Sequence, residues 1–187
     1  MIEVRDATPD RRGDVEVVMG TRGDPSRCWC QWFRMRSAEW RTTTRAANRD
    51  ALVAQLDDAV PPGVLAYDEG DPAGWAGLAP RTDYPRLAHS RVSAATSDVP
   101  GLWAVTCFVV RVGYRRRGVA GALLDGAVEF ARRNGGRVVE GYPIDTATRE
   151  SVSSSELYHG SLALFTRAGF REVARPSEHR PVVRLDL

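Results

Sequence analysis

A short basic turn holds the residues whose types and spacing best suit a chemical task. Small residues follow it at Gly118, Ala120 and Gly121. The spacing beyond them predicts a helix, whose first turn leaves backbone N–H groups without partners and favours negative charge. Because glycine lets a ligand approach the backbone closely, the turn predicts a site for an anion such as a pyrophosphate. The cations are Arg111, Arg115, Arg116 and Arg117.

Two predicted elements position this turn. The apolar run from Trp103 to Val110, rich in β-branched and aromatic residues, is typical of a buried strand. After the turn, Leu123, Leu124, Ala127, Val128 and Ala131 recur at helical spacing, and the helix is expected to stop at 134–136. A solvated turn that merely joins these two elements is the structural alternative.

The rest of the chain predicts a mixture of strands and helices. A hairpin implies antiparallel pairs, whereas the strand–helix–strand unit of 103–144 implies one parallel pair, so the expected class is α+β. The other expected elements are strand 2–7, a helix after Thr8, helix 38–58 with an internal cap at Asn48, hairpin strands 63–69 and 73–79, loop 80–100, strand 136–144, loop 145–155, helix 155–169, and strands 170–175 and 180–187.

Composition limits the class of protein. With 187 residues and 43% hydrophobic content, the chain is expected to form a single domain, 1–187. A net charge of +2 gives no reason to expect nucleic acid or a membrane as partner. Three cysteines do not make a disulfide framework, and the charged N-terminus does not suit a signal peptide. A cytoplasmic monomer or homodimer is expected.

The spacing Arg115-x-x-Gly118-x-Ala120 resembles the acetyl-CoA pyrophosphate loop of the GNAT (GCN5-related N-acetyltransferase) superfamily. The segments 110–115 and 164–170 resemble two further patterns of that superfamily, and the likeness covers about 60–187. Segment 20–60 corresponds to a variable, substrate-side helical region, and its Cys-Trp-Cys sequence resembles uncharacterised actinobacterial members. The resemblance implies the GNAT fold, with a mostly antiparallel central sheet and helices on both faces.

The resemblance also implies an activity, the acetyl-CoA-dependent transfer of an acetyl group to a primary amine of a small molecule or peptide by direct attack. No metal is implied. Backbone N–H groups near a bulge at about 108–110 would hold the thioester carbonyl. The implied cofactor-binding residues are Phe108, Val109, Val110, Arg115, Arg116, Arg117, Gly118, Val119, Ala120, Gly121 and Phe165.

Proton transfer is where the sequence departs from the superfamily. The tyrosine that often protonates the leaving thiolate corresponds to Phe165, so departure of a thiolate with a pKa of about 8.5 is expected to need no enzymic acid. Tyr158 is a further catalytic candidate, but seven residues along one helix would place it about 10 Å from position 165. Glu140 and Tyr142, which alternate on one strand, are the candidate bases.

Trp29 and Trp32, with Tyr142, are the expected substrate-contacting residues, because aromatic faces hold apolar or cationic groups. Core packing is the alternative for each of them. Lesser hypotheses are zinc binding at Cys28-x-Cys30, an acetylated Cys107, and catalytic roles for the residues Glu156, His159 and His89.

The sequence leaves other functions open. Loss of a tyrosine at position 165 favours, as an alternative, a non-catalytic domain that binds or senses acyl-CoA. Nucleic-acid binding through the basic turn would need a second basic surface. A dinucleotide-binding Rossmann domain is excluded, because the turn lacks Gly-x-Gly-x-x-Gly and the hairpin breaks the strand–helix alternation.

Overall fold

The computed structural model describes residues 1–91, 93, 96–149, 151–153 and 156–187. These residues form one seven-stranded sheet in the order β1-β2-β3-β4-β5-β7-β6, in which every neighbouring pair is antiparallel except β4–β5. This confirms the expected α+β class. The strands are β1 Ile2–Asp6, β2 Gly63–Asp68, β3 Asp71–Pro80, β4 Leu102–Val110, β5 Val138–Gly141, β6 Arg171–Ser177 and β7 Arg180–Asp186.

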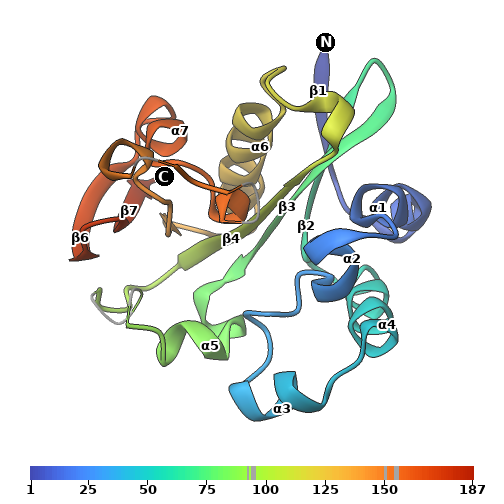
Figure 1. Cartoon of the computed structure of the whole chain (residues 1–187), viewed down its shortest axis with the longest axis horizontal. Coiled ribbons are helices and arrows are strands. Elements are labelled where there is room, and N and C mark those ends of the chain that lie inside the picture. The colour runs from blue at the N-terminus through green and yellow to red at the C-terminus, as the bar shows by residue number, and fades with distance from the viewer. Residues whose placement is uncertain (92, 94–95, 150, 154–155) are drawn as a thin grey trace.

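Helices cover both faces of the sheet (Figure 1). The long helix α6 packs on β1 to β4, and α1 packs on the opposite face against β3 and β4. The helices are α1 Arg12–Met19, α2 Gly23–Cys28, α3 Ser37–Thr42, α4 Arg45–Gln55, α5 Pro85–Ala88, α6 Val119–Arg133 and α7 Leu162–Arg167. A short helix, α5, therefore lies within the expected loop 80–100, of which residues 92, 94 and 95 are outside the described residues.

The expected helix 38–58 is two helices, α3 and α4. Thr44 caps α4, because its Oγ1 accepts a hydrogen bond from the backbone N–H of Ala47 at 3.1 Å. The predicted cap, Asn48, lies instead inside α4, where its buried side chain donates to the carbonyl of Arg27 in α2. The prediction of a continuous helix was wrong because Thr43 and Thr44 take extended backbone conformations, which end α3, and the Thr44 hydroxyl then starts α4.

The expected helix 155–169 is also divided. Its first part is a 3-10 turn, Leu157–His159, and Gly160 follows with a φ of 76° before Ser161 caps α7. Tyr158 and Phe165 therefore do not share one helix, contrary to the sequence prediction. The expected first residue, Ser155, lies outside the described residues.

Candidate active site

The basic turn lies where β4 feeds α6, as predicted. Gly118 is the N-cap of α6 with a φ of 88°, a left-handed conformation that glycine adopts readily. The first intrahelical bond runs from Ala122 N to Gly118 O, so the N–H groups of the three preceding helical residues have no carbonyl partner within the helix. Beyond the backbone of α6 itself, the described residues place no group within 4 Å of a Cβ added to Gly121, so the first turn is open to a ligand.

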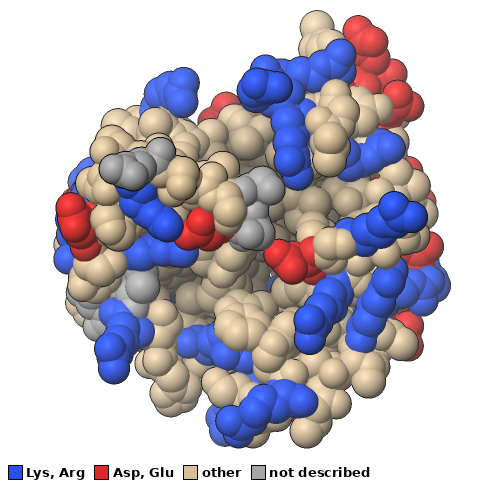
Figure 2. Space-filling view, viewed as in Figure 1, with Lys and Arg blue, Asp and Glu red and all other residues tan. Residues whose placement is uncertain are grey.

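The folded chain brings acids to this turn that the sequence did not indicate. Arg117 pairs with Asp68 at 2.8 Å, and the hydroxyl of Tyr114 donates to Asp71 at 3.1 Å. Arg115 donates to the carbonyl of Val110 at 3.3 Å, whereas Arg116 is exposed and forms no ion pair with the described residues. Figure 2 shows a face hollowed at its centre, with basic side chains around this end of α6.

The strands β4 and β5 separate next to this turn. Their parallel pairing covers Leu102–Val105 against Val138–Gly141, and β4 then continues to Val110 without β5. This separation of the two strands is named here the splay. The bulge in β4 lies at Thr106, since Gly77 pairs with Cys107 and Leu78 with Val105, and not at 108–110 as predicted.

The splay exposes one backbone edge of β4. Arg111 N donates to Ala73 O in the direction of β3. Because alternate residues of a strand direct their N–H groups to the same edge, Val109 also points toward β3, and Phe108 and Val110 point to the edge that β5 has left. The Val110 carbonyl accepts from Arg115 on that edge. Two candidate donors for a carbonyl oxygen therefore face the gap.

Glu140 lies in a buried ion-pair network, defined here as Glu140, Tyr142, Thr96, Arg81 and Arg184. Its Oε1 accepts from Tyr142 at 2.5 Å, and its Oε2 accepts from Thr96 at 2.8 Å and from Arg184 at 2.7 Å. Arg81 Nε lies 3.3 Å from Oε1, near enough for an ion pair but without hydrogen-bond geometry. Glu140 is fully buried, so an acceptor amine has no direct route to its carboxylate.

Tyr142 is likewise buried in the ion-pair network. Burial, and then the adjacent charge of Glu140, raises the pKa of Tyr142 well above its usual value. The phenol therefore remains protonated at neutral pH and donates a hydrogen bond to Glu140. The two candidate bases, Glu140 and Tyr142, therefore hold each other in place where the pairing of β4 with β5 ends.

Phe165 is fully buried in the core on the α6 face of the sheet. Its ring makes edge contacts with Phe108 and Phe170, at centroid distances of 6.0 and 5.0 Å. The ring also fills the space in which a Cβ on Gly141 would stand, 2.3 Å from Phe165 Cε1. In this structure it supports β4 and β5 from behind and presents no surface to a cofactor.

The two tryptophans expected at the substrate site differ in position. Trp29 is buried among the residues of α1 and α4, and its Nε1 donates to the carbonyl of Ser26 at 2.7 Å. Trp32 is only partly buried and lies beneath the guanidinium of Arg86, whose Cζ is 3.9 Å from the ring centroid. Of the two, Trp32 is the one that reaches a cavity.

That cavity, named here the aromatic pocket, has a volume of about 540 Å³. It lies between the segment before α3, the end of α5 and the 3-10 turn Leu157–His159, which packs on β4. Its arginines could not be predicted from local sequence patterns, because they belong to separate segments. The described lining residues are Trp32, Phe33, Arg36, Ser37, Arg86, His89, Ser90, Tyr158 and His159.

Tyr158 and His159 stack in this pocket with ring centroids 3.9 Å apart. Burial raises the pKa of Tyr158 to about 12. Burial, with a further contribution from the charge of Arg180, lowers the pKa of His159 to about 3. The imidazole is therefore neutral at physiological pH, and its buried Nδ1 has no hydrogen-bond partner among the described residues.

The depressed pKa of His159 predicts a specific loss of stability in acid. The unfolded chain binds a proton near pH 6.5 and the folded chain only near pH 3, so stability falls as pH drops through this window. The expected slope is up to about 1.4 kcal/mol per pH unit. Urea unfolding at several values between pH 7 and 5 should show this slope in the wild type and a smaller one in His159→Asn. His89→Asn, which removes an exposed imidazole, is the control, and equal slopes in all three proteins would contradict the assignment.

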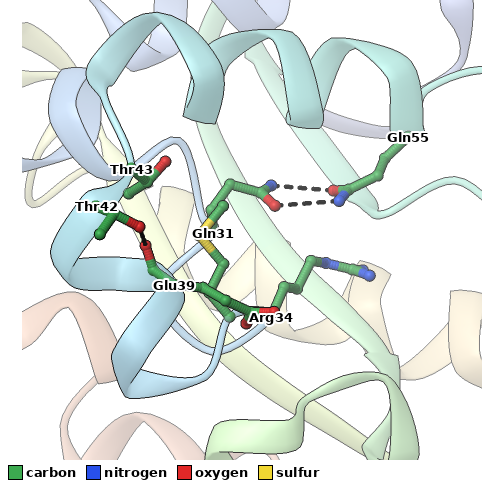
Figure 3. Close-up of a pocket in the computed structure, with 7 residues that line it drawn as sticks. Gln31, Arg34, Glu39, Thr42, Thr43 and Gln55 are labelled. Carbon is green, nitrogen blue, oxygen red and sulfur yellow. Dashed lines mark hydrogen bonds between the residues drawn. The ribbon is translucent and has the colours of Figure 1, made fainter.

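A second, more open hollow of about 460 Å³ lies beside α3 and α4 (Figure 3). Gln31 and Gln55 face each other across it and exchange two hydrogen bonds of 3.1 Å. Their amides satisfy each other, and the described residues that line this hollow leave no buried polar side-chain atom unpaired. It offers less to a ligand than the aromatic pocket does.

The cysteines show no metal centre. Cys30 Sγ accepts from Trp75 Nε1 at 2.9 Å, and all three cysteines are free thiols. Within the described residues, no group of three or more His, Cys, Asp or Glu side chains is placed to hold a metal ion. In the same part of the chain, no helix has the length and apolar character needed to cross a membrane.

The sequence matches the family described as acetyltransferase (GNAT) family over residues 29–170. The match covers well over half of the chain, which therefore belongs to the GNAT acetyltransferase family. This confirms the resemblance expected from the loop that begins at Arg115. No curated protein sequence matches the chain significantly.

Solved structures share this fold at low sequence identity. The GNAT domain of PAT from S. lividans has a TM-score of 0.55 and 16% identity, covering 100% of this chain and 90% of that one. A GCN5-related N-acetyltransferase from Kribbella flavida has a TM-score of 0.52 and 18% identity, with coverages of 100% and 98%. PaiA N-acetyltransferase from Thermoplasma acidophilum, solved in complex with coenzyme A, has a TM-score of 0.53 and 11% identity, with coverages of 100% and 99%. Identities this low establish the fold alone.

Proposed function

We propose that the protein is an acetyl-CoA-dependent N-acetyltransferase whose acceptor is a primary amine of a small molecule or peptide, attacking directly. The observation that carries this proposal is the free edge of β4, where the N–H groups of Phe108 and Val110 face the splay. Donors fixed in a sheet stabilise developing negative charge on an oxygen without having to reorganise. The coenzyme A complex of the Thermoplasma relative supports the choice of cofactor.

The residues present fit coenzyme A. The open first turn of α6, with its unpaired N–H groups, suits a pyrophosphate, and the splay suits an extended arm. When bound, acetyl-CoA supplies the acetyl group as a thioester. Val109 directs its N–H toward β3, so it contributes packing rather than a hydrogen bond. The proposed pyrophosphate-binding residues are Arg115, Arg116, Arg117, Gly118, Val119, Ala120 and Gly121.

Among the described residues of the site, we identify no enzymic base that would act near neutrality. Glu140 and Tyr142 are engaged with each other, and Phe165 has no ionisable group. His159, with its low pKa, is suited to accept a hydrogen bond from a neutral amine rather than to deprotonate an ammonium group. We therefore assign Glu140 and Tyr142 as positioning residues, and the acceptor as reacting in its neutral form.

This assignment predicts that the pH dependence of kcat/KM is set by the pKa of the acceptor amine and not by a group of the protein. The value of kcat/KM should rise tenfold per pH unit until the pKa of the acceptor amine and then level off, because only the neutral amine attacks. For two acceptors whose amines have different pKa values, the pH at which kcat/KM levels off should differ by the same amount in steady-state thiol-release assays. If kcat/KM levelled off at the same pH for both acceptors, a base of the enzyme would take the proton.

The alternative function is a non-catalytic domain that binds or senses acyl-CoA. It is favoured by Phe165 and by the engagement of Glu140 in the ion-pair network. Purified protein should be incubated with acetyl-CoA and a broad panel of amines while free thiol is measured. Acceptor-dependent thiol release supports the enzyme. Micromolar CoA binding with no release above background for any amine supports the sensor.

We further propose that residues 1–187 form one domain in which segment 20–60 serves the acceptor. This segment supplies one wall of the aromatic pocket through Trp32, Phe33 and Arg36. Helices α2 and α4 pack together behind that wall. If segment 20–60 is exchanged for the corresponding segment of another GNAT protein, the preference among acceptor amines is expected to change and the Kd for CoA to stay the same.

A further inference from the structure

The aromatic pocket is cationic. Of the described residues that line it, two are arginines, two are histidines and none is acidic. Trp32, Phe33 and Tyr158 give it aromatic walls, so a ligand would meet apolar faces beside positive charge. Its volume lies within the range of small-ligand sites. An occupant with an apolar body and an anionic group matches both features.

Arg86 is held in one orientation by neighbouring groups. Its Nε donates to the Trp32 carbonyl at 2.6 Å, its Nη1 donates to Ser37 Oγ at 3.2 Å, and its plane lies over the Trp32 ring. Arg86 forms no ion pair with a carboxylate among the described residues. Its Nη2 is buried and has no hydrogen-bond partner there. A buried guanidinium nitrogen without a partner is unfavourable unless a ligand supplies an acceptor.

His159 gives a second unpaired group in the same pocket. Its side chain is only 8% exposed, and its Nδ1 lacks a partner among the described residues. As a neutral imidazole, it can accept a hydrogen bond from an amine N–H. The turn that carries it packs on β4. His159 itself lies against the backbone of Thr106, where β4 continues beyond its pairing with β5. The pocket thus presents a donor for an anion and an acceptor for an amine.

The geometry points to a carboxylate-bearing acceptor: the aromatic pocket takes a small primary amine that carries a carboxylate and an apolar body, such as an aromatic amino acid. Arg86 Nη2 donates to the carboxylate, and His159 Nδ1 accepts from the amine. Arginine suits this task, because its guanidinium is permanently charged and its donors match carboxylate geometry. The inference rests on the proposed acetyl transfer and names the substrate class of that site.

Phenylalanine and phenylalaninamide form the test pair, since they differ only at the carboxylate. With wild-type protein and acetyl-CoA, kcat/KM per neutral amine should be about 10- to 100-fold higher for phenylalanine. Arg86→Gln should reduce this ratio to about one while the Kd for CoA, measured by calorimetry, stays unchanged. Arg91→Gln, which removes an exposed arginine just beyond α5, should keep the wild-type ratio.

Each result decides one of the two proposals. Equal turnover of acid and amide by the wild type overturns the carboxylate inference and leaves the acetyltransferase in place. An unchanged ratio in Arg86→Gln overturns the role of Arg86. If no amine is acetylated, the acetyltransferase proposal fails, and calorimetry of both compounds on CoA-loaded protein decides the inference. Selective binding of phenylalanine then supports it, and equal or absent binding overturns it. The wild-type comparison needs no variant, so poor folding of Arg86→Gln would not leave the question undecided.

Discussion

Gly121→Glu is expected to weaken CoA binding roughly 100-fold or more, because the new carboxylate would stand where the pyrophosphate is proposed to bind and would remove its hydrogen bonds. The folded state should tolerate the change. In the described part of the chain, nothing outside the backbone of α6 lies within 4 Å of the new Cβ. Gly121 also lies in the first turn of α6, where a glutamate is favourable. Calorimetric titration with CoA gives the affinity, and thermal unfolding gives Tm.

Gly13→Glu is the matched control for this variant. Gly13 also lies in the first turn of a helix, α1, and none of the residues that the structure describes comes within 4 Å of a Cβ added there, apart from the helix backbone. Helix α1 packs on the opposite face of the sheet. It introduces the same charge and should leave the Kd for CoA unchanged. If Gly121→Glu bound CoA as the wild type does, the pyrophosphate would have to bind elsewhere.

Glu140→Gln is expected to destabilise the protein by about 3–5 kcal/mol, because it leaves Arg81 and Arg184 buried with too little negative charge. The side chains of these arginines are 8% and 12% exposed, so water does little to compensate them. For a chain of this length the loss corresponds to a fall in Tm of roughly 6 to 20 °C. Urea and thermal unfolding measure it directly.

Glu129→Gln is the control for charge removal in an ion pair. Glu129 pairs with Arg132 on the exposed side of α6, where such pairs contribute about 1 kcal/mol or less. It should change Tm little. A Glu140→Gln protein with wild-type stability and no turnover would instead identify Glu140 as the base that sequence reasoning first suggested.

Local patterns predicted the parts of the site that lie close together in the chain. The strand ending at Val110, the small-residue turn at Gly118 before the helix and the apolar face of α6 all follow from nearest-neighbour chemistry, and each is present. The parallel β4–β5 pair follows from the connecting helix in the same way. Local signals therefore sufficed for the proposed cofactor loop.

Long-range contacts determined what sequence reasoning misjudged. Glu140 and Tyr142 alternate along one predicted strand and look available to a substrate. The fold brings Arg81, which directly follows β3, and Arg184, which lies in β7, against Glu140. The bulge lies at Thr106 because the neighbouring strand β3 pairs Gly77 with Cys107 and Leu78 with Val105, which leaves Thr106 without a partner on β3.

The two tryptophans illustrate the same limit. Trp29 and Trp32 are three positions apart, but a left-handed turn that begins at Trp29, with a φ of 49°, sends one into the core and the other to the aromatic pocket. Arg86 gave no signal because its partners lie about fifty positions earlier in the chain.

A crystal structure of the protein with acetyl-CoA, or with a non-hydrolysable analogue, tests the central claim most directly. The account predicts the pyrophosphate on the first turn of α6, the pantetheine arm between β4 and β5, and the thioester carbonyl oxygen about 3 Å from the N–H of Phe108 or Val110. A thioester carbonyl bound away from the free edge of β4, or an arm that runs outside the splay, would contradict it.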